Sequence, residues 1–130
     1  MQKKQKKPSV LLVDDDSFMR ETLKLILQSE EYPVIGEAFN GEDAVEFCVH
    51  SGPGLVLLDI NMPKMDGLQA LEEIHKVSPK TIVMMISAEA TMDRVKEAIG
   101  RGAAGFIVKP LSPASVLDRI SQCLKTENKE

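Results

Sequence analysis

Charged side chains follow three apolar runs of this 130-residue chain and point to one shared site. Asp14 and Asp15 follow the first run, and Asp59 follows the third. Lys109 follows the fifth. If these runs are parallel strands of one sheet, their carboxyl ends lie along a single edge, where open α/β sheets bind ligands. Two carboxylates about 4 Å apart repel by roughly 4 kcal/mol at an effective dielectric constant near 20, so the cluster requires a cation. The pattern therefore predicts a metal site.

The number of carboxylates favours magnesium over calcium. Calcium takes six to eight oxygen ligands, more than Asp14, Asp15 and Asp59 supply, whereas magnesium keeps several waters and binds through one or two carboxylates plus phosphate oxygens. The incomplete ligand set therefore indicates that a phosphoryl group completes the coordination sphere.

The same residue types are suited to phosphoryl transfer. A carboxylate beside magnesium can attack phosphorus and form an aspartyl phosphate, because the metal and a nearby lysine neutralise the transferring group. Lys109 suits this second role as a compact point charge. Ser87 follows the apolar run Ile82–Ile86 and offers a hydroxyl donor to a phosphoryl oxygen.

Length and charge predict one cytoplasmic domain. A chain of 130 residues with net charge -4 has room for one core, and the acidic balance argues against a general nucleic-acid surface. No apolar stretch approaches the roughly 20 residues of a membrane span, and the lysine-rich start lacks the apolar core of a signal peptide. We expect a basic flexible tail over 1–7, a domain over 8–125 and a polar tail over 126–130. The lysines of the first tail leave open contact with an acidic partner or a membrane surface; they are Lys3, Lys4, Lys6 and Lys7.

The cysteines and histidines are isolated from one another. Cys48 and Cys123 fall among apolar residues without a CxxC pair, so we expect buried reduced thiols. His50 and His75 have no neighbouring Cys, His or carboxylate at metal-ligand spacing, so we expect both on the surface.

Apolar runs of strand length alternate with segments of helical periodicity, which predicts successive βα units and a parallel sheet. The predicted strands lie at 9–13, 33–38, 54–58, 81–86 and 105–108. The second is mixed in polarity, so we place it at an edge of the sheet. Four helical stripes are expected to cover the sheet; their residues are Met19, Leu23, Ile26 and Leu27, then Leu68, Leu71 and Ile74, then Val95, Ala98 and Ile99, and finally Val116, Ile120 and Leu124.

Several helix ends are marked by capping residues. Side chains able to accept from free backbone amides stand before three predicted helices, and glycines follow a fourth. The start signals are Asn40 with Asp43, Asp66 with Gln69, and Ser112 before Pro113; the end signals are Gly100 and Gly102.

Four separated motifs, taken together, resemble the receiver domain of two-component response regulators, and in style the single-domain chemotaxis (CheY-like) type. They are Val13-Asp14-Asp15, then Leu57 to Gly67 with the sequence LLDINMPKMDG, then Ile86-Ser87-Ala88, and then Phe106-Ile107-Val108-Lys109-Pro110. The resemblance covers about residues 8–125. It implies a flavodoxin-like (βα)5 fold, a doubly wound parallel α/β sheet. Its strand order of 2-1-3-4-5 is that of CheY itself, so the order comes from the resemblance and not from the residue pattern.

The resemblance also implies a role for each site residue. Asp59 becomes the phosphoacceptor, and Asp14 and Asp15 hold Mg²⁺ with Asp59 and the backbone carbonyl of Asn61. Lys109 contacts the phosphoryl group and precedes a cis peptide bond to Pro110.

Further residues are implied to act in switching and in phosphate lifetime. The Ser87 hydroxyl moves toward the phosphoryl group, and Phe106 turns inward. Asn61 and Glu89 stand where family members tune attack by water. Chemotaxis members often carry tyrosine where this chain has Phe106, so a partner contact through that hydroxyl is in question. Asp16 is either a helix cap or solvated charge, or a residue that shapes the metal site.

The expected function is phosphoryl transfer from a histidine kinase or histidine phosphotransfer protein to Asp59, which switches binding to a separate output protein. A flagellar motor switch leads among such partners. We expect a monomer without nucleic-acid binding or membrane insertion, and no enzyme activity beyond its own phosphorylation and dephosphorylation. A phosphorelay intermediate, a phosphate sink and an isolated receiver of a longer regulator remain open.

Three other functions compete with this one. A phosphatase of the haloacid dehalogenase type would use Asp14 as nucleophile, but it needs a later acidic pair and a larger core. A flavodoxin-like electron carrier needs a glycine- and hydroxyl-rich phosphate loop where this chain has three aspartates, which would repel flavin phosphate. A degenerate receiver that only binds is disfavoured because the acidic ligands and Lys109 are all present.

Overall fold

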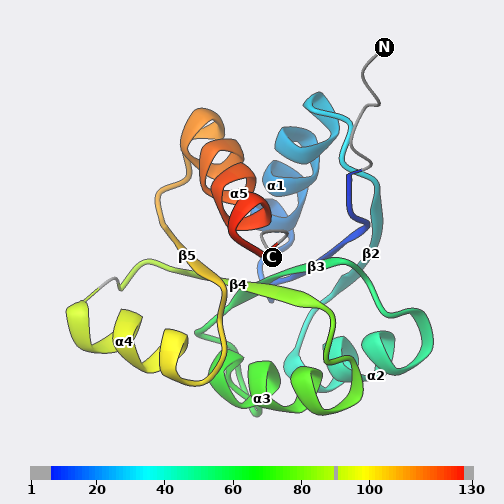
Figure 1. Cartoon of the computed structure of the whole chain (residues 1–130), viewed down its shortest axis with the longest axis vertical. Coiled ribbons are helices and arrows are strands. Elements are labelled where there is room, and N and C mark those ends of the chain that lie inside the picture. The colour runs from blue at the N-terminus through cyan, green and yellow to red at the C-terminus, as the bar shows by residue number, and fades with distance from the viewer. Residues whose placement is uncertain (1–6, 90, 128–130) are drawn as a thin grey trace.

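The computed structural model of the chain describes residues 7–89 and 91–127, in which strands and helices alternate (Figure 1). The strands are β1 (Val10–Val13), β2 (Val34–Ala38), β3 (Leu55–Asp59), β4 (Ile82–Ser87) and β5 (Gly105–Val108). The helices are α1 (Ser17–Ser29), α2 (Gly41–Ser51), α3 (Gly67–Val77), α4 (Met92–Gly100) and α5 (Pro113–Glu127).

All strand pairs are parallel, and the sheet order is β2-β1-β3-β4-β5. The α/β fold class, the strand order and the edge position of β2 are therefore confirmed. The mixed polarity of β2 follows from its place, because Ile35 and Glu37 are exposed at the edge. The predicted strand bounds lie within one residue of the observed ones.

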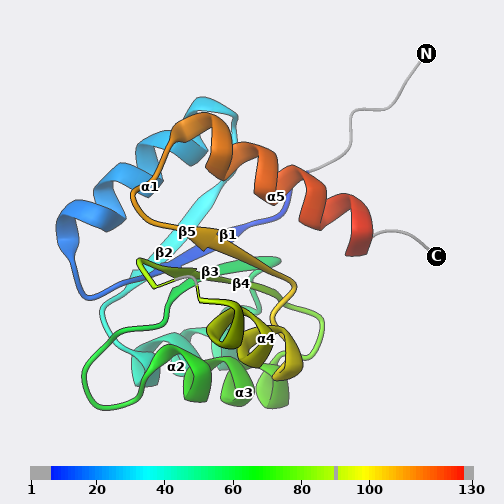
Figure 2. The ribbon, with the colours of Figure 1, turned by 90° about the vertical axis from the view of Figure 1, so that its left-hand side faces the viewer.

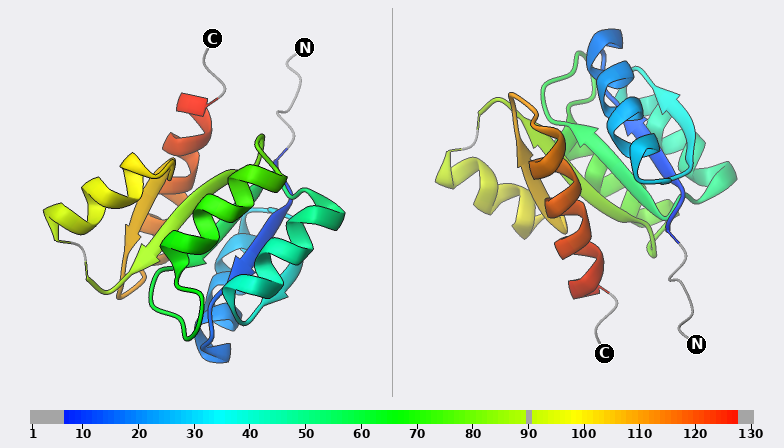
Figure 3. Two further views of the ribbon diagram at one scale, coloured as in Figure 1. Left: turned by 90° about the horizontal axis from the view of Figure 1, so that it is seen from below. Right: turned by 90° about the horizontal axis from the view of Figure 1, so that it is seen from above.

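Helices cover both faces of the sheet, as Figure 2 shows. Helices α1 and α5 pack on one face, and α2, α3 and α4 pack on the other (Figure 3). Each face has its own buried apolar cluster, which explains why the central strands are apolar on both sides. Neighbouring residues of β1 illustrate the alternation, since Leu11 belongs to the cluster under α2 and α3 and Leu12 to the cluster under α1 and α5.

The predicted capping residues stand at helix starts. The Asn40 side chain accepts from the Asp43 amide at 2.8 Å, and the Asp66 side chain accepts from the Gln69 amide at 2.9 Å. Ser112 accepts from the amide of Ser115 at 3.3 Å, one turn into α5. At the end of α4, Gly102 has a φ of 113°, a conformation that favours glycine.

The third predicted stripe differs from expectation at one residue. Ala98 is fully buried, but 48% of Ile99 is exposed, so the prediction that Ile99 covers the sheet is wrong. Helix α4 is nine residues long and lies toward the β5 edge of the sheet (Figure 1). Its contact with the core is therefore narrow: Ala98 is its one buried residue, and the partly buried Val95 packs beside it.

The cysteines and histidines largely follow the sequence prediction. Cys48 and Cys123 are buried and free. His50 is exposed and lies 3.0 Å from a carboxylate oxygen of Glu46. His75 is half-buried, not fully at the surface, because its ring lies against Gly102.

The two predicted tails are only partly described by the structure. Lys3, Lys4 and Lys6 lie outside the described residues, whereas the Lys7 ammonium lies 4.6 Å from the centroid of the Tyr32 ring. Helix α5 continues through Thr126 and Glu127, and residues 128–130 lie outside the described part. Across residues 7–89 and 91–127, no helix combines the length and apolarity needed to cross a membrane.

We predict that Leu57→Ala and Ile99→Ala differ sharply in stability. Leu57 is completely buried in the central strand β3, so its truncation should lower the free energy of unfolding by about 2–5 kcal/mol. Ile99→Ala on the exposed side of α4 should change it by no more than about 0.5 kcal/mol. Urea unfolding measures both values, and equal losses for the two variants would contradict the described packing.

Candidate phosphoacceptor and metal site

The carboxyl ends of the parallel strands bring the predicted charged residues together. Asp14 directly follows β1, and Asp59 is the last residue of the adjacent strand β3. Carboxylate oxygens of Asp14, Asp15 and Asp59 all lie within 4.8 Å of one another. Asp14 and Asp59 are buried, with 1% and 3% of their surface exposed, while Asp15 is exposed. The predicted acidic cluster therefore forms at this edge of the sheet.

Lys109 reaches into the cluster from the end of β5. Its ammonium nitrogen lies 3.3 Å from Asp14 Oδ2 and 3.6 Å from Asp59 Oδ1. One ammonium thus faces two buried carboxylates, with the third carboxylate nearby. The four side chains carry a net charge of about -2 when all are ionised, so the cluster retains a strong preference for a further cation.

Asp14 is held by the start of α1. Its Oδ1 accepts a hydrogen bond from the Asp16 amide at 2.9 Å. The Asp16 side chain in turn accepts from the Phe18 amide at 3.0 Å, which makes Asp16 the N-cap of α1. Of the two roles left open for Asp16, the structure therefore shows the cap.

Asp59 is held by the loop that follows β3. Its Oδ1 lies 3.4 Å from the Asn61 amide, which donates to it. Gly67, at the start of α3, donates its amide to the Ile60 carbonyl at 2.8 Å. A Cβ at Gly67 would stand 2.6 Å from the Cα of Ile60 and would also overlap the Asp59 carbonyl oxygen. Glycine is required here because any larger residue would push the backbone that carries Asp59.

Burial raises the pKa values of the two buried carboxylates, and a neighbouring carboxylate adds to each rise. Burial raises the pKa of Asp59 to about 6; the charge of Asp14 adds to the rise, and the Lys109 ammonium opposes it. Burial also raises the pKa of Asp14, against the Asp16 amide hydrogen bond and the Lys109 charge. Both shifts mean that full ionisation costs free energy in the folded protein, which a bound cation would offset.

Ser87 ends β4 between the strands that carry Asp59 and Lys109. The Lys109 amide donates to the Ser87 carbonyl at 2.9 Å, and Ile86 pairs with Asp59 in the sheet. The Ser87 side chain is buried, and its Oγ accepts from the Glu89 amide at 3.0 Å. The side chains of Asn61 and Glu89 are exposed on the loops that follow β3 and β4. The predicted hydroxyl and both predicted lifetime-tuning residues are thus on this side of the molecule.

Phe106 lies on the face of β5 that is covered by α4. It pairs with Met85 in the sheet, and only 8% of it is exposed. It belongs to the same buried cluster as Ala98 and Ala103. The inward placement expected of a switched Phe106 is therefore the placement that the structure holds.

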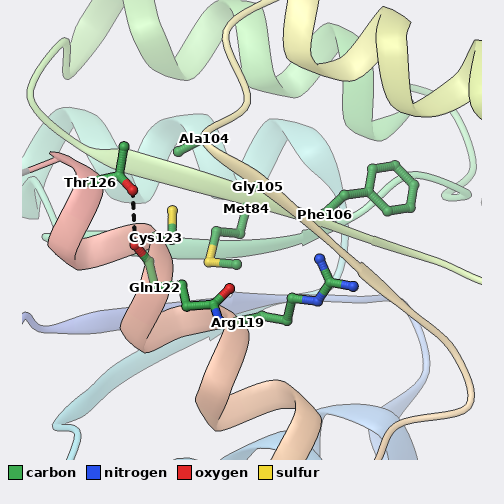
Figure 4. Close-up of a pocket in the computed structure, with 8 residues that line it drawn as sticks. All are labelled: Met84, Ala104, Gly105, Phe106, Arg119, Gln122, Cys123 and Thr126. Carbon is green, nitrogen blue, oxygen red and sulfur yellow. Dashed lines mark hydrogen bonds between the residues drawn. The ribbon is translucent and has the colours of Figure 1, made fainter.

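A separate hollow of about 180 Å³ lies on the other side of β5, against α5 (Figure 4). Its lining residues are Met84, Ala104, Gly105, Phe106, Arg119, Gln122, Cys123 and Thr126. Within it, Thr126 donates its hydroxyl to the Gln122 carbonyl at 3.1 Å. Burial raises the pKa of the Cys123 thiol to about 11, so this thiol stays protonated and is a poor nucleophile near neutral pH. The hollow holds none of the predicted site residues except Phe106.

Sequence reasoning missed three residues that support the site. Gly67 permits the close approach of α3 to β3, and Arg20 and Glu37 form an ion pair at 3.0 Å beside Asp14. The periodicity did carry a signal for Arg20, because it stands three residues before Leu23 and seven before Leu27 on the buried side of α1. A charged residue on the buried face of a helix indicates a specific partner.

The donor set fits a magnesium ion. Three carboxylates within 4.8 Å offer hard oxygen ligands, and the exposure of Asp15 leaves one side of the cluster open to water. Magnesium binds in this manner, through a few carboxylates with water or phosphate oxygens in the remaining positions.

Comparison with known proteins identifies the family. Residues 10–121 match the response regulator receiver domain, and the chain therefore belongs to that family. Chemotaxis protein CheY of Thermotoga maritima is 43% identical over 116 residues, which cover 89% of this chain and 97% of that protein. Chemotaxis protein CheY of Treponema pallidum is 45% identical over 118 residues, which cover 89% of this chain and 82% of that protein.

A solved structure gives the same picture of the fold. The crystal structure of the CheX-CheY-BeF3-Mg²⁺ complex from Borrelia burgdorferi matches with a TM-score of 0.85 and 41% identity, over 89% of this chain and 88% of that one. The chain is therefore a CheY-like receiver domain of two-component signalling.

The raised pKa of Asp59 predicts an unusual pH dependence of stability. Because the folded-state pKa of about 6 exceeds the ordinary value of 3.8, the folded protein binds more protons between these values, and stability falls as pH rises. At about 1.4 kcal/mol per pH unit, the full effect is roughly 3 kcal/mol. Asp59→Asn removes this ionisation, so its stability relative to the unmodified protein should increase from pH 4 to pH 7.

Urea unfolding with a chelator present, at a series of pH values, measures this difference. Asp118→Asn on the exposed side of α5 is the control, since it removes the same charge outside the cluster. A stability difference for Asp59→Asn that does not vary with pH would show that Asp59 has an ordinary pKa.

Proposed function

We propose that the chain is a Mg²⁺-dependent phosphoacceptor that receives a phosphoryl group on Asp59 from a histidine kinase or a histidine phosphotransfer protein. The observation that carries this proposal is the meeting of Asp59 with Asp14, Asp15 and Lys109 at one sheet edge. It is supported by the membership of the receiver family and by the similarity to chemotaxis proteins.

In the transfer step, one carboxylate oxygen of Asp59 forms a bond to phosphorus while the bond from phosphorus to the donor imidazole nitrogen breaks. The electron pair of the broken bond stays on that nitrogen, and the donor ring, which carries a proton on its other nitrogen, leaves as neutral imidazole. Asp14, Asp15, Asp59 and the Asn61 carbonyl would hold Mg²⁺, which supplies charge neutralisation for the phosphoryl oxygens. The Lys109 ammonium, 3.6 Å from Asp59, stabilises the remaining negative charge.

In the switching step, Lys109 and Ser87 respond to the new charge on Asp59. In the structure, the Lys109 ammonium lies between the carboxylates of Asp14 and Asp59. A phosphoryl dianion on Asp59 would draw it away from Asp14. The Ser87 hydroxyl would move to donate to a phosphoryl oxygen, and its Oγ would release the Glu89 amide. Phe106 packs between β5 and α4, so this movement changes the surface of α4, β5 and α5.

The output of this switch is binding to a separate protein. Three apolar side chains are exposed on α4 and at the end of β5, where they offer apolar contacts to a protein partner. They are Met92, Ile99 and Val108. The Borrelia CheY was crystallised with CheX, BeF3 and Mg²⁺, which supports a protein partner for this chain as well. Similarity to chemotaxis proteins makes a flagellar motor switch the leading candidate.

We predict that Asp59→Asn abolishes covalent labelling by acetyl phosphate in the presence of Mg²⁺. Asparagine keeps the shape of the residue but lacks the nucleophilic oxygen. Intact mass spectrometry should show the gain of one phosphoryl group for the unmodified protein and for Asp118→Asn, but none for Asp59→Asn. Peptide mapping after borohydride trapping identifies the residue. Label on Asp14 would instead support the phosphatase reading and reject this proposal.

Lys109→Arg is predicted to keep labelling but impair switching. The guanidinium preserves the positive charge, yet its planar fork cannot occupy the same position as an ammonium between two buried carboxylates. The amide resonances of Ser87 and Phe106 should shift on addition of beryllofluoride and Mg²⁺ to the unmodified protein, and much less in the variant. Shifts of equal size in both proteins would show that Lys109 is not part of the switch.

A further inference from the structure

We propose that Arg20 is a positioning residue for the acidic cluster, which holds the peptide between Asp14 and Asp15 so that both carboxylates face a shared cation. The inference rests on the proposed Mg²⁺ site and adds a residue to it. Arg20 lies on the buried side of α1 and is only 8% exposed, the one cation in the buried class among residues 7–89 and 91–127.

The guanidinium of Arg20 is fixed by three contacts, one with the residue that follows β1 and two with residues in and directly after β2. One terminal nitrogen donates to the Asp14 carbonyl at 2.6 Å, and Nε donates to Glu37 Oε1 at 3.0 Å. The face of the guanidinium lies 4.1 Å from the centroid of the Phe39 ring. These contacts fix both the position and the plane of the guanidinium, and a lysine ammonium could not make all three of them.

The Asp14 carbonyl is an informative acceptor because it belongs to the peptide that joins Asp14 to Asp15. A bond at this oxygen fixes the rotation of the peptide, and with it the direction in which Asp15 leaves the strand. The next two peptides are held as well, since the Asp16 amide donates to Asp14 Oδ1 and the Arg20 amide donates to the Asp16 carbonyl at 3.1 Å. The first turn of α1 and the acidic loop are therefore one connected unit.

Such a device is needed because the carboxylates repel each other. Their oxygens lie within 4.8 Å, and Asp15 is exposed, so without restraint the loop would turn that carboxylate toward water. Lys109 restrains Asp14 and Asp59 but has no described contact with Asp15. Among the described contacts, the hydrogen bond from Arg20 to the Asp14 carbonyl is the one made to the Asp14–Asp15 peptide, which determines the direction of Asp15.

Glu37 gives Arg20 its charge balance. The Glu37 carboxylate accepts from Arg20 Nε and also lies 3.5 Å from the Lys24 ammonium. This pairing keeps the guanidinium directed at the backbone carbonyl and not at the Asp14 carboxylate, where it would compete with a metal ion. Partners that orient metal ligands in this indirect way typically contribute a factor of 10 to 100 to metal affinity.

The test is titration calorimetry of the full chain with MgCl₂ at pH 7.5. Arg20→Met should weaken Mg²⁺ binding by about 10-fold or more, and Arg20→Lys should restore little of it because the fork is lost. Lys24→Met is the matched control: it removes the other cation beside Glu37 without touching Asp14, and its affinity should stay within about twofold of the unmodified protein. The Mg²⁺ affinity of Glu37→Gln should lie between those of Arg20→Met and Lys24→Met.

A second readout separates positioning from a general loss of stability. The rate of labelling by acetyl phosphate, measured against Mg²⁺ concentration, should show a raised half-saturation value for Arg20→Met and a maximal rate close to that of the unmodified protein. Leu23→Ala, which truncates a buried neighbour on α1, should destabilise the fold yet leave the half-saturation value unchanged.

The outcomes are distinguishable. Mg²⁺ affinity of Arg20→Met within twofold of the unmodified protein, or an equal loss in Leu23→Ala, overturns the role of Arg20 alone. Failure of the unmodified protein to bind Mg²⁺ overturns the proposed function and this inference together. If Arg20→Met does not fold, Arg20→Lys and Glu37→Gln decide the matter by the same criteria.

Discussion

The repulsion between Asp14 and Asp59 is the constraint on which the rest of the structure depends. Two carboxylates that would separate in water are fixed side by side, because Asp14 follows β1 and Asp59 ends the adjacent β3 in a sheet whose register is set by buried side chains on both faces. Burial and a neighbouring carboxylate charge raise the pKa of each, and the single ammonium of Lys109 lowers both values only in part. The packing of the sheet therefore holds the two carboxylates closer together than their own repulsion would allow.

This arrangement links the core to the chemistry. A cation bound among the carboxylates lowers the repulsion, and a phosphoryl group on Asp59 alters it again by adding negative charge next to Lys109. The groups that must respond are attached to neighbouring strand ends, since Lys109 and Ser87 are joined by a backbone hydrogen bond. In the proposed function, a change at Asp59 would pass over these adjacent strands toward α4, whose contact with the core is narrow.

Sequence reasoning reached the fold and the centre of the site because both depend on local patterns. Asp14, Asp59 and Lys109 could be brought together from their place at the ends of apolar runs, since parallel strands share one carboxyl edge. The order of the strands came from the resemblance to receiver domains, because no local pattern determines which crossover goes to which side. The caps at Asn40 and Asp66 were predictable because their hydrogen bonds span three residues.

What the sequence did not reveal depends on contacts between distant segments. The role of Arg20 requires knowing that β2 lies beside β1, so that Glu37 reaches the guanidinium across 17 positions of sequence. The need for glycine at position 67 appears only when α3 is seen against the backbone of Asp59. Periodicity assigned Ile99 to the core. A short helix near the sheet edge, however, contacts too little of the sheet to bury all of its apolar side chains, and Ile99 stays exposed.

The central claim is that Asp14, Asp15 and Asp59 share one divalent ion so that Asp59 can be reversibly phosphorylated. A crystal structure of the protein with beryllofluoride and Mg²⁺ tests it most directly. The account predicts beryllium bonded to a carboxylate oxygen of Asp59, with the ion beside it held by the three aspartates and the Asn61 carbonyl. An adduct on another residue, or an Asp59 adduct formed without an ion among these carboxylates, would contradict it.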